Sequence, residues 1–149
     1  MNDEQKRLVK ESWRKVVPIA DQAARRFYDR LFESDPTTRP LFQTANLDEQ
    51  RQKLIKALVT VVQGLDNLEA IVPVVTDLGC RHARYGVTDS HYESVGAALL
   101  WTLEQGLGSA WTPEIKAAWS SEYSLVGGAM RKAASDQHEP GPSRRGVAT

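Results

Sequence analysis

The sequence predicts an all-α domain built of about seven to eight helices of unequal length. Apolar residues recur at spacings of three and four along most of the chain, and residues that begin or end helices stand between these segments. No segment alternates as a strand would, and the β-branched stretch 71–75 contains Pro73, which suits a sheet interior poorly. The 149 residues, 41% of them hydrophobic, suffice for one domain with a sizeable core.

The first three predicted helices are marked by polar caps and prolines. Asp3 is the expected N-cap of the first helix, and Pro18 disturbs its end. A second helix is expected over about residues 20–32. Asp35 and Pro36 then fit the N-cap and the first position of a short third helix.

The longer helices follow in the middle and at the end of the chain. Asp48 is the expected N-cap of a helix that ends near Gly64, and the next helix covers about residues 68–84. Asp89 and Thr112 are the expected N-caps of the last two helices. Residues 1–134 therefore form the predicted domain, while the polar residues 135–149 are expected to be a disordered tail.

Composition excludes several classes of protein. The 19 basic and 19 acidic residues give no net charge, which does not favour binding to nucleic acid or to acidic membranes. The N-terminus is charged and no apolar run is long enough to span a bilayer. Cys80 has no second cysteine to pair with, which suits a reducing compartment, so the expected location is the cytoplasm.

His82 is the residue with the clearest chemical potential. It stands near the end of a helical segment that breaks at Gly86, while His91 lies beyond that break and His138 lies in the tail. One such imidazole cannot build a multi-histidine metal cage, but it can supply one axial ligand to a metal already held by a porphyrin. On frequency alone, a lone histidine at a helix end is more often a surface or capping residue.

Several short strings occur in a characteristic order along residues 8 to about 131. They are Glu11-Ser12-Trp13, Phe27-Tyr28-Asp29-Arg30-Leu31-Phe32, Asp35-Pro36, Pro40-Leu41-Phe42-Gln43, Leu78-Gly79 with His82, Tyr85-Gly86-Val87, Tyr92 with Val95-Gly96, and Ala118-Trp119 with Tyr123. Their order and spacing resemble the globin family, in particular single-domain globins related to neuroglobin and the haem domain of flavohaemoglobins. The resemblance implies a three-over-three helical sandwich around haem b.

The same resemblance assigns roles around the haem. It implies that His82 is the proximal iron ligand, and that Tyr28, Gln50 and Leu54 line the distal side, where the gas binds. Gly79 would allow a close backbone approach. The remaining expected haem contacts are Phe42, Lys53, Leu78, Tyr85, Val87, Val95 and Leu99.

The distal pair departs from better-known globins, because the distal histidine is missing. Gln50 is a poor iron ligand, so a bis-histidine state should not form through this position. The phenol of Tyr28 and the amide of Gln50 are instead donors suited to the partial negative charge on bound dioxygen. A hydrogen bond to such a group contributes about 1.5–3 kcal/mol, and the less polar carbon monoxide should gain less.

The proximal side has two further candidates. Tyr92 and Glu114 match positions that flavohaemoglobin-like globins use to hydrogen-bond the proximal imidazole. A carboxylate linked to that N–H makes the ring more electron-donating. Glu114 also stands in the first turn of the last predicted helix, where acidic residues are common for reasons unrelated to any cofactor.

Reversible binding of dioxygen, nitric oxide and carbon monoxide is therefore the expected function, with no residue singled out as catalytic. The alternative is a nitric oxide dioxygenase, since the distal and proximal residues resemble that enzyme-like pattern. Flavohaemoglobins carry flavin and nicotinamide domains after the globin, whereas residues 135–149 are polar and no Gly-rich dinucleotide loop occurs, so a separate reductase is expected. A haem-free helical interaction module, using exposed Trp101 or Trp111, is the remaining alternative.

Overall fold

The computed structural model describes residues 1–43 and 45–138, and within these ranges every regular element is a helix. Six are α-helices, which is slightly fewer than the seven to eight expected, and the all-α fold class is confirmed. The α-helices are α1 (Asp3–Val16), α2 (Ala20–Ser34), α3 (Leu47–Gln63), α4 (Leu68–Arg84), α5 (Asp89–Leu107) and α6 (Pro113–His138). Short 3₁₀ segments cover Val17–Ile19, Pro36–Phe42 and Gly108–Ala110.

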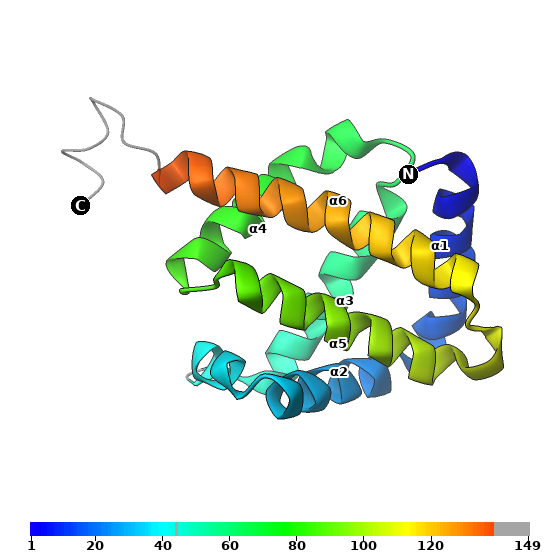
Figure 1. The fold of residues 1–149 in the computed structure, drawn as a ribbon, viewed down its shortest axis with the longest axis horizontal. Coiled ribbons are helices and arrows are strands. Elements are labelled where there is room, and N and C mark those ends of the chain that lie inside the picture. Colours follow the sequence, from blue (N-terminus) through cyan, green and yellow to red (C-terminus); the bar gives the residue numbers. More distant parts are fainter. Residues whose placement is uncertain (44, 139–149) are drawn as a thin grey trace.

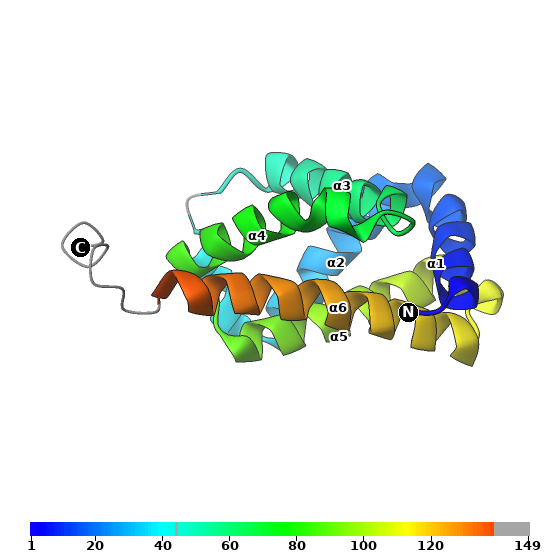
Figure 2. The ribbon, with the colours of Figure 1, turned by 90° about the horizontal axis from the view of Figure 1, so that it is seen from above.

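The α-helices form two layers of three. One layer consists of α1, α3 and α4, and the other of α2, α5 and α6 (Figure 1). Figure 2 shows α3 and α4 on one side of the molecule, with α5 and α6 on the other. The layers are joined mainly where α4 and α1 cross α6, while α2 packs on both α3 and α5. This is the expected three-over-three arrangement.

Several predicted helix starts are displaced by one or two residues. Helix α1 begins after Asn2, whose side-chain oxygen accepts the backbone N–H of Gln5 at 2.7 Å. Asn46 likewise replaces Asp48 as the cap of α3, and Thr88 precedes α5. An amide or hydroxyl side chain just upstream therefore takes the cap, and the carboxylates occupy the first helical turn, where they are also favoured.

Two other predicted caps are confirmed, although one begins a different kind of helix. Asp35 accepts the backbone N–H of Thr37 at 3.1 Å, but the segment that follows is 3₁₀. Pro40 lies inside that segment and lacks the N–H that an α-helix would need. The hydroxyl of Thr112 accepts the backbone N–H of Ile115 at 3.1 Å at the start of α6.

A buried hydrogen bond joins α1 to α6 across the layers. The indole N–H of Trp119 donates to the hydroxyl of Ser12 at 2.8 Å, and Ser12 donates in turn to the backbone oxygen of Leu8 at 2.7 Å. Trp13 packs edge-on against Trp119, with ring centroids 6.3 Å apart. Both polar groups in this part of the core are thus satisfied, so burying them carries little penalty.

The last helix is longer than the sequence predicts. It continues beyond the expected boundary at Ala134 and ends at His138, so residues 135–138 are helical. The remainder of the expected tail, residues 139–149, lies outside the described residues.

On the inner face of α6, Glu122 is only 3% exposed, and burial raises the pKa of its carboxyl group to about 7.

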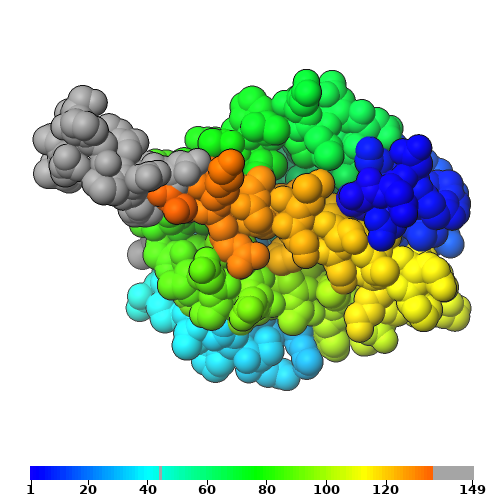
Figure 3. Space-filling model, turned by 45° about the horizontal axis from the view of Figure 1, so that its top comes forward, coloured from blue at the N-terminus to red at the C-terminus, as the bar shows by residue number. Residues whose placement is uncertain are grey.

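Helices α4 and α6, from opposite layers, pack against each other (Figure 3). A Cβ atom at Gly79 would lie 2.4 Å from the backbone oxygen of Met130 and 2.8 Å from its Cα. No side chain fits in that space, so glycine is required for the two backbones to pack this closely. The close backbone approach that Gly79 allows is to α6.

The end of α4 is fixed by a pair of backbone hydrogen bonds. Gly86, at φ 90°, donates its N–H to the oxygen of Ala83, and Val87 donates to the oxygen of His82 at 3.0 Å. This is a Schellman cap, for which a left-handed glycine is the usual residue. The backbone of His82 is thereby held at a defined position in the last turn.

Within the part of the chain described, no helix combines the length and hydrophobicity needed to cross a bilayer.

We predict that Gly79→Ala lowers the free energy of unfolding by about 1–3 kcal/mol, because the added methyl group overlaps the backbone of α6. Chemical denaturation would measure the change. The matched control is Gly128→Ala on the exposed side of α6, where an added Cβ meets no atom within 4 Å. That variant should gain about 0.5–1 kcal/mol from improved helix propensity. Equal effects of the two substitutions would contradict the proposed backbone contact.

Candidate functional site

Three buried side-chain atoms among the described residues lack a hydrogen-bond partner: Nε of Arg51, Nδ1 of His82 and the hydroxyl of Tyr92. Buried polar atoms in folded proteins are almost always paired, so each of these atoms requires an explanation. His82 and Tyr92 are two of the residues that the sequence predicts on the proximal side. Arg51 directly follows Gln50, which the sequence places on the distal side. Two of the three unpaired atoms therefore belong to predicted site residues, and the third belongs to the residue that follows Gln50 in the sequence.

The imidazole of His82 is partly buried on α4 and faces the ring of Tyr92. The two ring centroids are 6.2 Å apart, and the rings are inclined at 64°. Burial lowers the pKa of His82 below its ordinary value, and the neighbouring charge of Arg81 lowers it further. The ring is therefore neutral at neutral pH, which is the form that binds a metal.

Tyr92 is held on α5 by contacts with α6. Its backbone oxygen accepts the hydroxyl of Tyr123 at 2.5 Å, and the guanidinium of Arg131 lies 5.2 Å from its ring centroid. Burial raises the pKa of the Tyr92 phenol, so it keeps its proton. Neither the Tyr123 bond nor the cation over the ring was anticipated, because residues so far apart in sequence leave no local pattern.

The structure does not bring Glu114 to the proximal imidazole. Glu114 is exposed in the first turn of α6. The part of α6 that contacts Tyr92 lies around Gly127 and Arg131. That contact is about 20 Å further along the helix at about 1.5 Å per residue. Glu114 occupies its position because acidic side chains are favoured at helix starts.

On the other side of the site, Tyr28 and Gln50 lie together. Tyr28 is only 5% exposed on α2, and burial raises the pKa of its phenol. The side chain of Gln50 and the positive charge of Arg51, both on α3, partly offset that rise. The phenol also packs edge-on against Phe42, with ring centroids 5.5 Å apart. The structure thus brings the predicted distal pair together beside the predicted aromatic contact.

The other expected haem contacts differ in how far their side chains are exposed to solvent. Leu99 is buried, whereas Leu54, Val95, Leu78 and Val87 are partly buried. Lys53 and Tyr85 are exposed, so they could reach a cofactor only at its solvent edge. Leu54, Val95 and Phe42 also pack against the main hydrophobic core, which gives this region its apolar lining.

This set of residues fits a porphyrin held by one axial ligand. Among residues 1–43 and 45–138, no group of three or more His, Cys, Asp or Glu side chains could hold a metal ion alone. What the region offers is one neutral, partly buried imidazole on α4, apolar side chains, and two polar donors, Tyr28 on α2 and Gln50 on α3. A metal in such a site must bring most of its ligands with it, as haem iron does.

His91 has a structural role that its position explains. Its Nδ1 accepts the backbone N–H of Thr88 at 3.0 Å, and its Nε2 lies 3.3 Å from the hydroxyl of Thr37. Both ring nitrogens are engaged at the start of α5, so this histidine is not available as a metal ligand.

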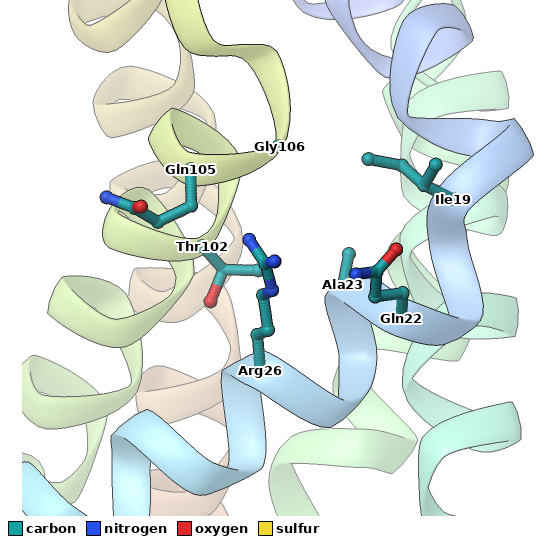
Figure 4. A pocket seen from close by; sticks show the side chains of 7 residues that line it. All are labelled: Ile19, Gln22, Ala23, Arg26, Thr102, Gln105 and Gly106. Carbon is teal, nitrogen blue, oxygen red and sulfur yellow. The ribbon is translucent and has the colours of Figure 1, made fainter.

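A surface hollow between α2 and α5 is separate from this region (Figure 4). Its volume is about 170 Å³, and polar side chains such as Arg26 and Gln105 contribute to its lining. Ligand pockets usually exceed about 300 Å³ and are mostly apolar, so this hollow does not suit a macrocycle.

The two tryptophans considered as anchors for a partner are both partly buried. The guanidinium carbon of Arg30 lies 4.9 Å from the ring centroid of Trp101, and Trp111 is also partly buried. Neither tryptophan is the exposed anchor that an interaction module would use.

Comparison with known proteins agrees with this description. The family model described as Globin matches residues 25–130. The chain is 32% identical over 137 residues to the flavohemoprotein of Bacillus subtilis (strain 168), covering 88% of this chain and 34% of that protein. It is 33% identical over 122 residues to the flavohemoprotein of Rhodopirellula baltica, covering 80% of this chain and 30% of that protein. The chain thus spans about a third of the length of these relatives.

A solved structure shows the same fold. The crystal structure of a hexacoordinated heme protein from an anhydrobiotic tardigrade superimposes with a TM-score of 0.81, covering 91% of this chain and 96% of that one. Their sequences are only 18% identical, so this likeness concerns the fold alone. The matched family model and the relatives above 30% identity carry the assignment further: this chain belongs to the globin family.

Proposed function

We propose that this chain binds haem b through His82 and reversibly binds dioxygen, with nitric oxide and carbon monoxide as further ligands. The observation that carries the proposal is the neutral, partly buried imidazole of His82, whose Nδ1 has no partner, in a chain of the globin family. When bound, the haem would supply an iron atom with a coordination position open to small gases.

On the proximal side, His82 would bind the iron through one ring nitrogen. Its other ring nitrogen must be held to fix the orientation of the ring. Tyr92 is the group placed to do this, because its ring faces the imidazole and its own hydroxyl is unpartnered. The contacts of Tyr92 with α6, through Tyr123 and Arg131, hold it in place.

On the distal side, Tyr28 and Gln50 would donate hydrogen bonds to a polar ligand. The raised pKa of Tyr28 keeps its hydroxyl protonated at neutral pH, so it remains a donor. Leu54 and Phe42, which are apolar and partly buried, would exclude water from the same space. Low local polarity strengthens the remaining hydrogen bonds, and this favours slow release of dioxygen.

A nitric oxide dioxygenase supported by a separate reductase is the second candidate. It is favoured by similarity to flavohemoproteins and by the juxtaposition of Tyr28 with Gln50 and of Tyr92 with His82. It is weakened by the placement of Glu114, because the carboxylate expected to enrich the imidazole lies far along α6. For this reason reversible binding is the favoured function.

His82→Gly should abolish stable binding of haem, because it removes the proposed iron ligand and both ring nitrogens of His91 are engaged elsewhere. The absorption spectrum of the purified protein measures this as loss of the Soret band. Added imidazole should restore part of the band, since it can occupy the space of the missing ring. His91→Asn is the control, because it removes an imidazole that caps α5. An unchanged spectrum in His82→Gly would refute the assigned ligand.

Tyr28→Phe should accelerate release of dioxygen by roughly 10- to 100-fold, because one donor to a partly charged ligand is lost. Stopped-flow measurement of the dissociation rate tests this. Carbon monoxide serves as an internal control, since it is less polar and its release should change less. Equal acceleration of both gases would mean that the substitution altered packing instead of a hydrogen bond.

The two candidate functions differ in sustained turnover. A reversible gas-binding protein should consume about one equivalent of nitric oxide when loaded with dioxygen and then stop. With an added cellular reductase and its reduced nicotinamide, a dioxygenase should continue to consume nitric oxide. A nitric oxide electrode would record either result, and many turnovers per haem would favour the dioxygenase over reversible binding.

A further inference from the structure

We propose that Arg51 is a third polar group of the distal site and that its positive charge makes the site selective for anionic ligands. This inference rests on the proposed function, because the anions concerned would bind at a haem iron. It goes beyond that function by naming a ligand class that Tyr28 and Gln50, both neutral, would not favour by charge.

The guanidinium of Arg51 is buried in an unusual way. Its side chain is only 12% exposed, although Arg51 lies in the second turn of α3 with a polar residue on either side. Its Nε is buried and has no hydrogen-bond partner. A buried guanidinium nitrogen without a partner is unfavourable, and an anion is the partner it suits best.

The positive charge of Arg51 acts on the phenol of Tyr28. It lowers the pKa of Tyr28, in the same direction as the side chain of Gln50. Consecutive residues diverge by about 100° around a helix, so the side chains of Gln50 and Arg51 leave α3 in different directions. The cation therefore belongs to the same local environment as the two proposed donors.

One end of the guanidinium is tied to the surface. Its Nη2 forms an ion pair with the carboxylate of Asp48, which is 81% exposed in the first turn of α3. Asp48 partly neutralises the guanidinium from the solvent side, while Nε remains on the buried side. The strength of this exposed pair is expected to set how much positive charge the site presents to a ligand.

The test uses the haem-loaded ferric protein and azide as the probe, with the dissociation constant measured by absorption spectroscopy. Arg51→Gln should raise that constant by roughly 10- to 100-fold, because a charged donor is lost. Arg51→Lys should retain part of the affinity. Carbon monoxide binding to the ferrous protein should stay within about 3-fold in both variants, since the ligand is neutral.

A second variant tests the same idea without touching the buried side chain. Asp48→Asn should tighten azide binding by about 3-fold, because Arg51 keeps its charge and loses its exposed partner. Glu49→Gln removes an adjacent exposed carboxylate of the same turn and should leave azide affinity unchanged. Lys56→Gln removes an exposed cation of α3 and is the matched control for Arg51→Gln.

The outcomes separate this inference from the proposed function. Weaker azide binding in Arg51→Gln and tighter binding in Asp48→Asn, with unchanged controls, would support it. Unchanged azide affinity in a protein that still binds haem would overturn it and leave the proposed function intact. Faster transfer of haem to a competing apoprotein, with unchanged azide affinity, would also overturn it, because Arg51 would then serve a carboxylate of the cofactor. Failure of the unmodified chain to bind haem would overturn the proposed function itself.

Discussion

The close contact of α4 with α6 at Gly79 is the constraint on which the rest of the site depends. Without a side chain at that position, the backbone of α4 can lie directly against Met130. His82 lies one turn further along α4, so the depth of the crossing determines where its imidazole stands. A larger residue at Gly79 would move the whole helix, and with it the proposed iron ligand.

The same helix α6 also supports the second proximal residue. Tyr123 donates to the backbone of Tyr92, and Arg131 covers its ring, while Trp119 joins α6 to α1 through Ser12. One long helix therefore connects the N-terminal helix, the proximal tyrosine and the segment that carries His82. The proximal half of the site is built on this rigid support, whereas the distal half depends on the contact between α2 and α3.

Most of the fold could be predicted from the sequence, because helix periodicity and start signals are local. The errors are local as well. An Asn or Thr just before an Asp takes the cap, as Asn46 does upstream of Asp48. Pro40 makes the third helix 3₁₀. The end of α6 was placed too early, because composition changes after Ala134 while the first helix-breaking residue, Pro140, comes later.

The sequence could predict the placement of candidate site residues only where that placement follows from the residue's position along its own helix. Spacing and resemblance predicted His82 with Tyr92 and Tyr28 with Gln50, and the structure brings the members of each pair together. The structure does not bring Glu114 to the imidazole. An acidic residue at this position is already explained by its place at a helix start, so its presence gave no evidence of a contact with the imidazole. Spacing and resemblance gave no role to Arg51, because the burial of a long side chain leaves no local pattern in the sequence.

The capped end of α4 has a consequence for the electronic character of the proximal ligand. The aligned peptide dipoles of a helix leave about half a negative charge at its carboxyl end, and His82 stands within that last turn. If His82 binds iron as proposed, the backbone carbonyls at this helix end, two of which accept from Gly86 and Val87, would place negative potential near the imidazole without a carboxylate from Glu114. That contribution cannot be removed by protonating a side chain, and it is opposed by the nearby cation of Arg81.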